Sequence, residues 1–173
     1  GAPGLVYRFP NLFGKWSRPN YNSVVSTFCY NIAHDLDIQI NDPACIVTFV
    51  YVTDVVDEFL RQMESADDLQ RTQVYYEVSE TTSVSLGMLA GLIRAFRAVR
   101  DGGPIPDLSD PFTRKLYSTF LSYYDTKNFA YPATMNTDNR GWLFELIKSE
   151  QFGQIFVSTT HPGITRGNHG HDT

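Results

Sequence analysis

The chain has 173 residues and a net charge of −5, and its shares of hydrophobic (42%) and charged (19%) residues are ordinary for a folded protein. It is long enough to bury a core, either as one domain or as a small domain with an appendage. No run of Lys and Arg exceeds two residues, so we expect no nucleic-acid partner. No apolar run approaches the roughly eighteen residues of a membrane-spanning helix. Cys29 and Cys45 lie in apolar segments and are expected to be buried free thiols, which favours a reducing cytoplasm.

Strands and helices alternate in the first part of the chain. Residues 5–9 are β-rich and end at Pro10, so we expect a buried strand followed by a loop. Asn22 is a candidate N-cap for a helix with apolar residues at helical spacing, namely Val25, Cys29, Ile32, Ala33 and Leu36. Residues 37–40 and 45–52 are predicted to be strands. Thr53 is the expected cap of a second helix with an apolar face of Val55, Val56, Phe59, Leu60 and Met63.

The alternation continues as far as about residue 125. Residues 72–79 are predicted to form a strand, Ser85 to cap a helix, and Asp110 with Pro111 to begin another. The Ser85 helix carries three arginines near its C-terminal end, where cations favour the helix dipole: Arg94, Arg97 and Arg100.

Only short strands are predicted after this point, at residues 142–147 and 154–160. The change from alternating elements to strands alone predicts a domain boundary between residues 125 and 140. The second part has about 35 residues, too few to bury a core of its own.

His169 and His171 form a His-x-His pair near the end of the sequence. On a strand both imidazoles face the same side and can reach one metal ion, and Gly167 allows a close approach. A complete zinc site needs three or four ligands, so on residue types alone a polar tail that carries histidines is the more common explanation. His161, beside Pro162, is expected to be a turn residue.

Two further motifs have competing interpretations. Asn11, with Arg8 and Arg18, could line a crevice at the carboxyl end of a parallel strand, and ordinary loop chemistry is the alternative. Tyr123 and Lys127 match the Tyr-x-x-x-Lys spacing of short-chain dehydrogenases, but they lie at the end of a predicted helix and we interpret the match as coincidence. No G-x-x-G-x-x-G follows a strand, so the sequence contains no recognisable dinucleotide-phosphate loop.

Several long stretches together resemble one family. In chain order they are VYRFPNLFGKWSRPNYNSVVSTFCYNIA, VTFVYVTDVVDEFL, LYSTFLSYY and MNTDNRGWLFELIKSEQFGQIFVSTTHPGITRGNHGHDT. They are similar to bifunctional capsular polysaccharide enzymes of the CapF type. That family joins an extended short-chain dehydrogenase/reductase domain, of the NAD-dependent epimerase/dehydratase kind, to a C-terminal cupin domain. The resemblance implies an α/β fold. Residues 1–128 would be the C-terminal, substrate-binding part of a Rossmann-type extended reductase, and residues 129–173 a linker and the first strands of a cupin β-barrel (jelly roll).

The resemblance also implies a function. In the family, a UDP-linked 4-keto-6-deoxy-hexosamine is epimerised at C3 by the zinc-bearing cupin domain and reduced at C4 with NADPH by the reductase domain, on the route to UDP-N-acetyl-L-fucosamine. The full-length enzyme would be cytoplasmic and a homo-oligomer. Phe9 matches a position near the nicotinamide, Asn11 and Asn22 match substrate-binding positions, and His169 and His171 match zinc ligands.

The chain also departs from the family pattern. The cofactor loop and the catalytic Tyr-x-x-x-Lys pair would precede residue 1, and the other zinc ligands would follow residue 173. No catalytic residue is therefore assigned, and the chain alone is expected to be inactive. Residues 46–52 lack an arginine that often helps to hold the diphosphate in sugar epimerases, and Asp54 is interpreted as a helix-capping residue. The alternatives are a non-enzymatic module that binds a nucleotide-sugar or a partner, and a standalone metal-dependent cupin sugar isomerase.

Overall fold

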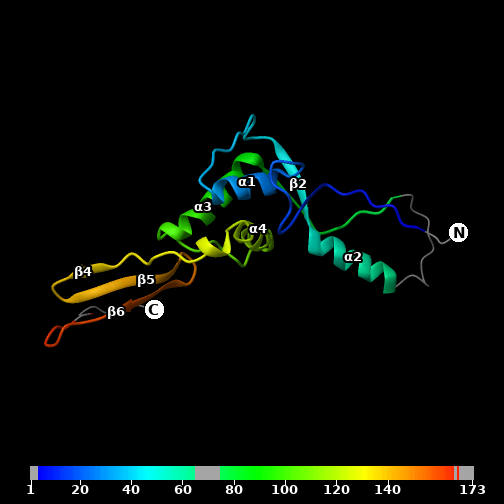
Figure 1. Cartoon of the computed structure of the whole chain (residues 1–173). Coiled ribbons are helices and arrows are strands. Elements are labelled where there is room, and N and C mark those ends of the chain that lie inside the picture. The colour runs from blue at the N-terminus through cyan, green and yellow to red at the C-terminus, as the bar shows by residue number, and fades with distance from the viewer. Residues whose placement is uncertain (1–3, 65–74, 166, 168–173) are drawn as a thin grey trace.

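The computed structural model describes residues 4–64, 75–165 and 167, and its fold is mixed α/β. Figure 1 shows helices α1, α3 and α4 gathered at the centre, with α2 extending to one side and strands β4, β5 and β6 to the other. The elements are β1 (Asn11–Phe13), α1 (Val24–Ala33), β2 (Ile46–Tyr51), α2 (Val52–Glu64), β3 (Thr81–Ser85), α3 (Leu86–Ala98), η1 (Val99–Asp101), α4 (Pro111–Leu121), η2 (Thr126–Asn128), β4 (Asn136–Asp138), β5 (Gly141–Ser149) and β6 (Gly153–Ser158).

The first sheet has the order β1-β2-β3, with β1 parallel and β3 antiparallel to β2. Successive residues of β2 face opposite sides, as in any strand, and both sides are covered. Phe49 belongs to the main core, which the sheet forms with α1, α3 and α4, whereas Val50 packs with Val55 and Val78 on the side of α2. The largest fully buried side chains of the main core are Phe49, Phe96, Phe120, Leu89, Ile93, Leu116 and Val25.

Two helix starts agree with the sequence prediction, because their caps are local. The Ser85 hydroxyl accepts a hydrogen bond from the Met88 N–H (3.1 Å), and the Asp110 carboxylate accepts one from the Thr113 N–H (2.7 Å). Pro111 occupies the first turn of α4, where its missing N–H costs nothing.

The other two predicted caps are wrong. Helix α1 is capped by Ser23, whose hydroxyl accepts from the Ser26 N–H (3.3 Å), so Asn22 lies one residue before the cap. Helix α2 begins at Val52, directly after β2, which places Thr53 inside the helix. A short side chain that caps well is common in loops, and neighbouring candidates cannot be told apart by residue type.

The predicted strand at residues 5–9 is reduced to a single bridge between Tyr7 and Tyr76. The Tyr76 N–H donates to the Val6 carbonyl (2.8 Å), and the Arg8 N–H donates to the Tyr76 carbonyl (3.0 Å). Pro10 has no N–H to donate, and beyond it the chain changes partner and pairs with β2 from Asn11 onward. The first regular strand therefore follows the proline, in the segment that was predicted to be a loop.

Other strand predictions divide between confirmed and wrong. The strand expected at residues 45–52 is β2, and those at 142–147 and 154–160 are β5 and β6. Residues 37–40 contain no strand. Of the strand predicted at residues 72–79, residues 72–74 lie outside the described residues. Residues 75–79 contain only the bridge at Tyr76, and the next regular strand is β3.

Burial also differs from expectation in α2. Of its predicted apolar face, Val55 is buried, whereas 51% of Leu60 and 73% of Met63 are exposed. Helical spacing identifies residues that share a face, but it does not say what covers that face. Cys29 is buried and free as predicted, and burial raises the pKa of its thiol; Cys45 is free but exposed, so its predicted burial is wrong.

The second sheet is antiparallel and has the order β4-β5-β6, with an irregularity in β5 between Glu145 and Ile147. It meets the helical part at Ile105, whose N–H donates to the Lys148 carbonyl (2.7 Å) and which bridges to Ser149. Within the ranges that the structure describes, no helix is both long and apolar enough to cross a membrane.

Candidate functional site

The loop of residues 14–22, between β1 and α1, is fixed at several points to the helices. The Asn20 N–H donates to the Thr27 hydroxyl (3.0 Å), and the Trp16 N–H donates to the Ser122 hydroxyl (3.4 Å). The Tyr123 hydroxyl donates to the Ser17 carbonyl (2.7 Å). The loop is therefore attached to α1 and to the residues that follow α4.

The same loop contains unusual backbone angles. Trp16 (φ 60°) and Asn20 (φ 54°) both adopt the left-handed region, which is uncommon for residues other than glycine. Such angles persist only where surrounding contacts fix them, and they are enriched at functional sites. Gly14 is needed for a different reason, because an added Cβ would lie 2.5 Å from Cγ1 of Val52, the first residue of α2.

The loop presents aromatic rings and cations to solvent. The Trp16 side chain is 80% exposed and that of Tyr21 is 70% exposed. The Lys15 ammonium lies 6.0 Å from the centre of the Trp16 ring, and the Arg18 guanidinium lies 5.5 Å from that of Tyr21. Exposed rings can stack on a planar ligand, and the cations can pair with an anion.

The three predicted ligand-binding residues in this part lie at different places along the chain. Phe9 stacks on Tyr7 (ring centres 5.7 Å apart) and lies beside Phe59 of α2 (6.0 Å). Asn11 begins β1, and its side-chain N–H donates to the Thr48 carbonyl (3.3 Å). Asn22 is exposed at the far end of the loop. Among the described residues, no hydrogen bond or ring contact joins Phe9, Asn11 and Asn22.

Asn11 nevertheless occupies a distinctive position. The extended chain pairs with Tyr76 through Tyr7 and with β2 from Asn11 onward, so Asn11 is the first residue after the change of partner. In open α/β sheets, ligands bind where the strand order changes, because loops there separate and leave a crevice. The amide of Asn11 can donate to an anionic or carbonyl oxygen at such a point.

A hydrogen-bonded group ties the segment before Asn11 to α2. Glu58 accepts hydrogen bonds from the Tyr7 hydroxyl (3.0 Å), the Gln62 amide (2.9 Å) and the Arg61 guanidinium. Burial opposes ionisation of this carboxyl, but the hydrogen bonds from Gln62, Arg61 and Tyr7 outweigh it and hold the pKa of Glu58 below its usual value. For Tyr7, burial together with the hydrogen bond to Glu58 raises the pKa to about 12.

The structure also explains the Tyr-x-x-x-Lys match. Tyr123 is buried, and its hydroxyl is engaged with the Ser17 carbonyl, whereas Lys127 is exposed on η2. Burial raises the pKa of Tyr123, which makes its hydroxyl a poorer acid. The pair has none of the arrangement that proton transfer to a ligand requires, in agreement with the interpretation as coincidence.

The predicted zinc ligands, His169 and His171, lie outside the described residues. Among the residues that are described, no three His, Cys, Asp or Glu side chains gather closely enough to hold a metal ion. The turn before them is described. The Ile164 N–H donates to the His161 carbonyl (3.2 Å), so His161 is a turn residue as predicted.

An ion pair between helices was not predicted from the sequence. The Lys115 ammonium donates to both carboxylate oxygens of Asp54, at 2.7 and 2.8 Å, beside a cavity of about 220 Å³ that Glu80 and Asp110 also line. Asp54 lies in the first turn of α2, where a carboxylate is favourable, but its partner is α4. The two residues are 61 positions apart, so no local pattern could have paired them.

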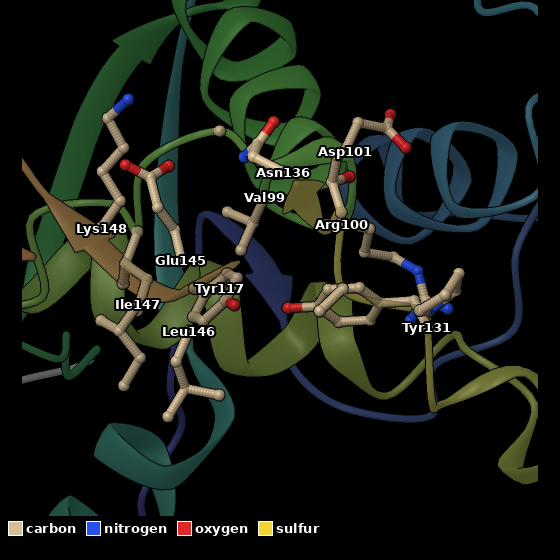
Figure 2. Close-up of a pocket in the computed structure, with 16 residues that line it drawn as sticks. Val99, Arg100, Asp101, Tyr117, Tyr131, Asn136, Glu145, Leu146, Ile147 and Lys148 are labelled. Carbon is tan, nitrogen blue, oxygen red and sulfur yellow. The ribbon is translucent and has the colours of Figure 1, made fainter. Parts of the chain in front are cut away.

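The arginines of α3 and η1 also have partners beyond the helix dipole. Arg97 pairs with Asp35, after α1, and with Asp101. Arg100 borders a cavity of about 460 Å³ between η1, α4 and β5, together with Tyr117 and Tyr131 (Figure 2). Burial, followed by the nearby Tyr131, raises the pKa of Tyr117.

Comparisons with known proteins all identify proteins of polysaccharide and nucleotide-sugar metabolism as similar to this chain. A family described as "Polysaccharide biosynthesis C-terminal domain" matches residues 136–173. The chain is 42% identical over 171 residues to the UDP-2-acetamido-2,6-beta-L-arabino-hexul-4-ose reductase of Pseudomonas aeruginosa, which covers 99% of this chain and 45% of that protein. The crystal structure of the capsular polysaccharide assembling protein CapF from Staphylococcus aureus is 43% identical, with a TM-score of 0.83, over 98% of this chain and 49% of CapF.

A second solved structure gives the same result. CapF in complex with the inhibitor 3-isopropenyl-tropolone is 43% identical, with a TM-score of 0.85, over 98% of this chain and 48% of that one. The chain therefore spans about half the length of the relatives that it matches.

Proposed function

The chain is homologous over nearly its whole length to proteins of the CapF type, and on this premise we propose that it belongs to a nucleotide-sugar epimerase/reductase of capsular polysaccharide synthesis. The single observation that carries the proposal is this identity of 42–43% over 98–99% of the chain. Residues 1–128 would form the substrate-binding part of the reductase domain, and residues 129–173 a linker and the start of the cupin domain. The absence of helix and strand from residues 129–135 supports this boundary.

The proposed substrate is a UDP-linked 4-keto-6-deoxy-hexosamine. A proton on C3 is acidified by the neighbouring C4 ketone, so a base and stabilisation of the enolate suffice to invert C3. When bound, zinc in the cupin domain would stabilise that negative charge, and NADPH in the reductase domain would supply the hydride for C4. The product would be the precursor UDP-N-acetyl-L-fucosamine. We also propose that the longer protein is a homo-oligomer of the cytoplasm.

The residues of this chain would serve in binding. Asn11 is proposed to donate its amide to the diphosphate, since it lies where the chain changes sheet partner. Asn22 is proposed to hold the substrate from the start of α1. Lys15 and Arg18 on the loop between them supply local positive charge in a chain whose net charge is −5, and an anion can be held by a few such cations.

Phe9 is proposed to lie beside the nicotinamide. Its ring is stacked on Tyr7 and the residue is 39% exposed, so part of its surface can contact a second planar group. Tyr7 is in turn held by Glu58 of α2, which fixes the orientation of the stack. His169 and His171 are proposed as two of the zinc ligands.

The proposal is tested with the longer gene product that contains this chain. We expect NADPH oxidation that depends on the UDP-linked keto sugar, and a drop of at least about tenfold in kcat/KM on Asn11→Ala, because a hydrogen bond to a charged group contributes about 1.5–3 kcal/mol. Asn41→Ala, in an exposed loop, is the matched control. Binding of the UDP-sugar without any NADPH oxidation would refute the enzyme and favour a binding module.

The zinc ligands are tested separately by metal analysis of the same longer product. We expect bound zinc in the wild type and its loss in His169→Ala and His171→Ala, with His161→Ala as the control because His161 lies in a turn. Zinc retained in both variants would exclude these two histidines as ligands.

A further inference from the structure

A single arginine contacts the start of the linker between the helical part and the C-terminal sheet. The Arg100 guanidinium donates to three consecutive carbonyls, those of Asn128 (2.5 Å), Phe129 (3.0 Å) and Ala130 (3.3 Å). This part of the chain lies outside any strand or α-helix, so no regular backbone ladder supplies donors to its carbonyls. The planar guanidinium, with five N–H groups, can supply several donors at once.

The same guanidinium lies against two aromatic rings. It is 4.4 Å from the centre of the Tyr124 ring and 4.8 Å from that of Tyr131. Tyr124 precedes the three contacted carbonyls in the sequence and Tyr131 follows them. Arg100 therefore holds the segment of residues 124–131 at both ends and in the middle, and each cation–π contact adds to the hydrogen bonds.

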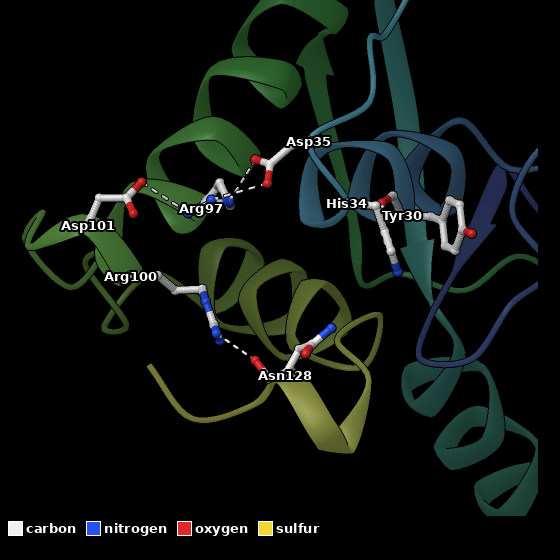
Figure 3. A network of polar contacts seen from close by, with 7 residues as sticks. All are labelled: Tyr30, His34, Asp35, Arg97, Arg100, Asp101 and Asn128. Carbon is white, nitrogen blue, oxygen red and sulfur yellow. Dashed lines mark hydrogen bonds and ion pairs between the residues drawn. The ribbon is translucent and has the colours of Figure 1, made fainter. Parts of the chain in front are cut away.

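Arg100 is itself held to the helical part (Figure 3). It belongs to η1, which continues α3, and the neighbouring Arg97 forms ion pairs with Asp35 (3.0 Å) and Asp101 (3.0 Å). Asp35 follows α1, so the end of α3 is tied to α1 as well. The position from which Arg100 reaches the linker is thus fixed by two helices.

A second contact joins the sheet to the helical part. The Ile105 N–H donates to the Lys148 carbonyl of β5 (2.7 Å). Arg100 and Ile105 both border the cavity of about 460 Å³, which Lys148 and Tyr131 also line (Figure 2). The contact of Arg100 with the linker and that of Ile105 with β5 thus lie around one cavity.

We propose that Arg100 is a positioning residue that fixes the C-terminal sheet, residues 136–158, in one orientation relative to the helical part. The proposed function assigns successive reactions to the two parts. On that basis, Arg100 would also set the placement of the two reaction sites relative to each other. The proposed orientation does not depend on those reactions.

The test is limited proteolysis of the 173-residue chain with chymotrypsin, which cleaves after aromatic residues. For Arg100→Ala we expect cleavage after Phe129 and Tyr131 to be at least about tenfold faster, because cleavage follows the population of the open segment. The cleavage rate of Arg100→Lys should lie between those of the wild type and Arg100→Ala, because an ammonium keeps the charge but lacks the planar set of N–H donors. Arg94→Ala, exposed on α3, is the matched control.

Cleavage after Tyr21, in the loop that α1 and α4 hold, serves as an internal reference. Its rate should stay unchanged in Arg100→Ala, and small-angle X-ray scattering should show a larger maximum dimension. Equal linker cleavage in Arg100→Ala and Arg94→Ala would overturn the proposal. A parallel rise at Tyr21 would overturn it too, because Arg100 would then stabilise the whole fold. None of these measurements requires NADPH oxidation. The positioning role of Arg100 can therefore be refuted while the proposed enzymatic function holds, and the enzymatic function can be refuted while the role of Arg100 holds.

Discussion

The ion pair between Lys115 and Asp54 allows a sharp prediction, because its two members have different surroundings. The Asp54 side chain is 13% exposed and that of Lys115 is 28% exposed. Lys115→Met leaves a carboxylate without its ammonium, beside a cavity to which Glu80 and Asp110 add negative charge. Asp54→Asn leaves an ammonium that still has these two carboxylates nearby. Removal of the lysine should therefore be the more damaging change.

The magnitude follows from burial. Fully exposed pairs contribute about 0.2–1 kcal/mol, and breaking a fully buried pair costs about 3–5 kcal/mol. Lys115 and Asp54 lie between these limits, so we expect Lys115→Met to lower the free energy of unfolding by about 2 kcal/mol and Asp54→Asn by about 1 kcal/mol. The double variant should cost less than the sum of the two, because the second change removes the charge that the first left unpaired.

The assay is urea unfolding of the three variants, followed by circular dichroism at low salt. Lys127→Met is the control, because Lys127 is exposed on η2, and it should change the free energy of unfolding by less than about 0.5 kcal/mol. A larger loss for Asp54→Asn than for Lys115→Met would refute the reasoning, and so would strict additivity of the two changes.

Three further predictions concern stability. Gly14→Ala should destabilise by about 1–3 kcal/mol through overlap with the start of α2, whereas Gly91→Ala, with no heavy atom within 4 Å of its added Cβ, should be neutral or stabilising in thermal unfolding. Ser85→Ala should cost about 1 kcal/mol in urea unfolding through loss of the α3 cap, and no change would mean that another donor or acceptor replaces it. The pKa of Glu58 is depressed in the folded chain. Its contribution to the free energy of unfolding is therefore present above the unfolded pKa of about 4.3 and is lost as pH falls through the folded pKa. Glu58→Gln should therefore flatten the loss of stability in acid, and an identical pH profile would contradict this.

Features that depend on neighbouring residues, such as two of the helix caps, were predicted better than features that depend on residues distant in sequence. Ser85 and Asp110 were identified as caps because a cap bonds to an N–H three residues away. The strand at residues 5–9 was misplaced because the apolar pattern is the same on both sides of Pro10, and the partners, Tyr76 and β2, are distant in sequence. The same limit hid the contact between Lys115 and Asp54.

The candidate site was predictable only in part. The residue pattern indicated Asn11 as a crevice residue, with ordinary loop chemistry as the alternative, whereas the substrate-binding roles of Asn11 and Asn22 came only from the resemblance. The left-handed angle of Trp16 carries no signal in residue type, because tryptophan rarely adopts it, whereas asparagine is enriched there and Asn20 did carry such a signal. The role of Arg100 was also hidden, since an arginine at the end of a helix fits the dipole equally well.

The direct passage from β2 into α2 has a mechanical consequence. Tyr51 ends the strand and Val52 begins the helix, so no loop is present to absorb a rotation. Helix α2 spans 13 residues, a rigid arm of about 20 Å, and a rotation of about 5° at its base would displace its tip by about 1.7 Å. Lys115 holds this arm within its first turn, close to the pivot. Because the Tyr7 hydroxyl also binds Glu58 in the middle of α2, a rotation at the base would displace the segment around Tyr7 as well.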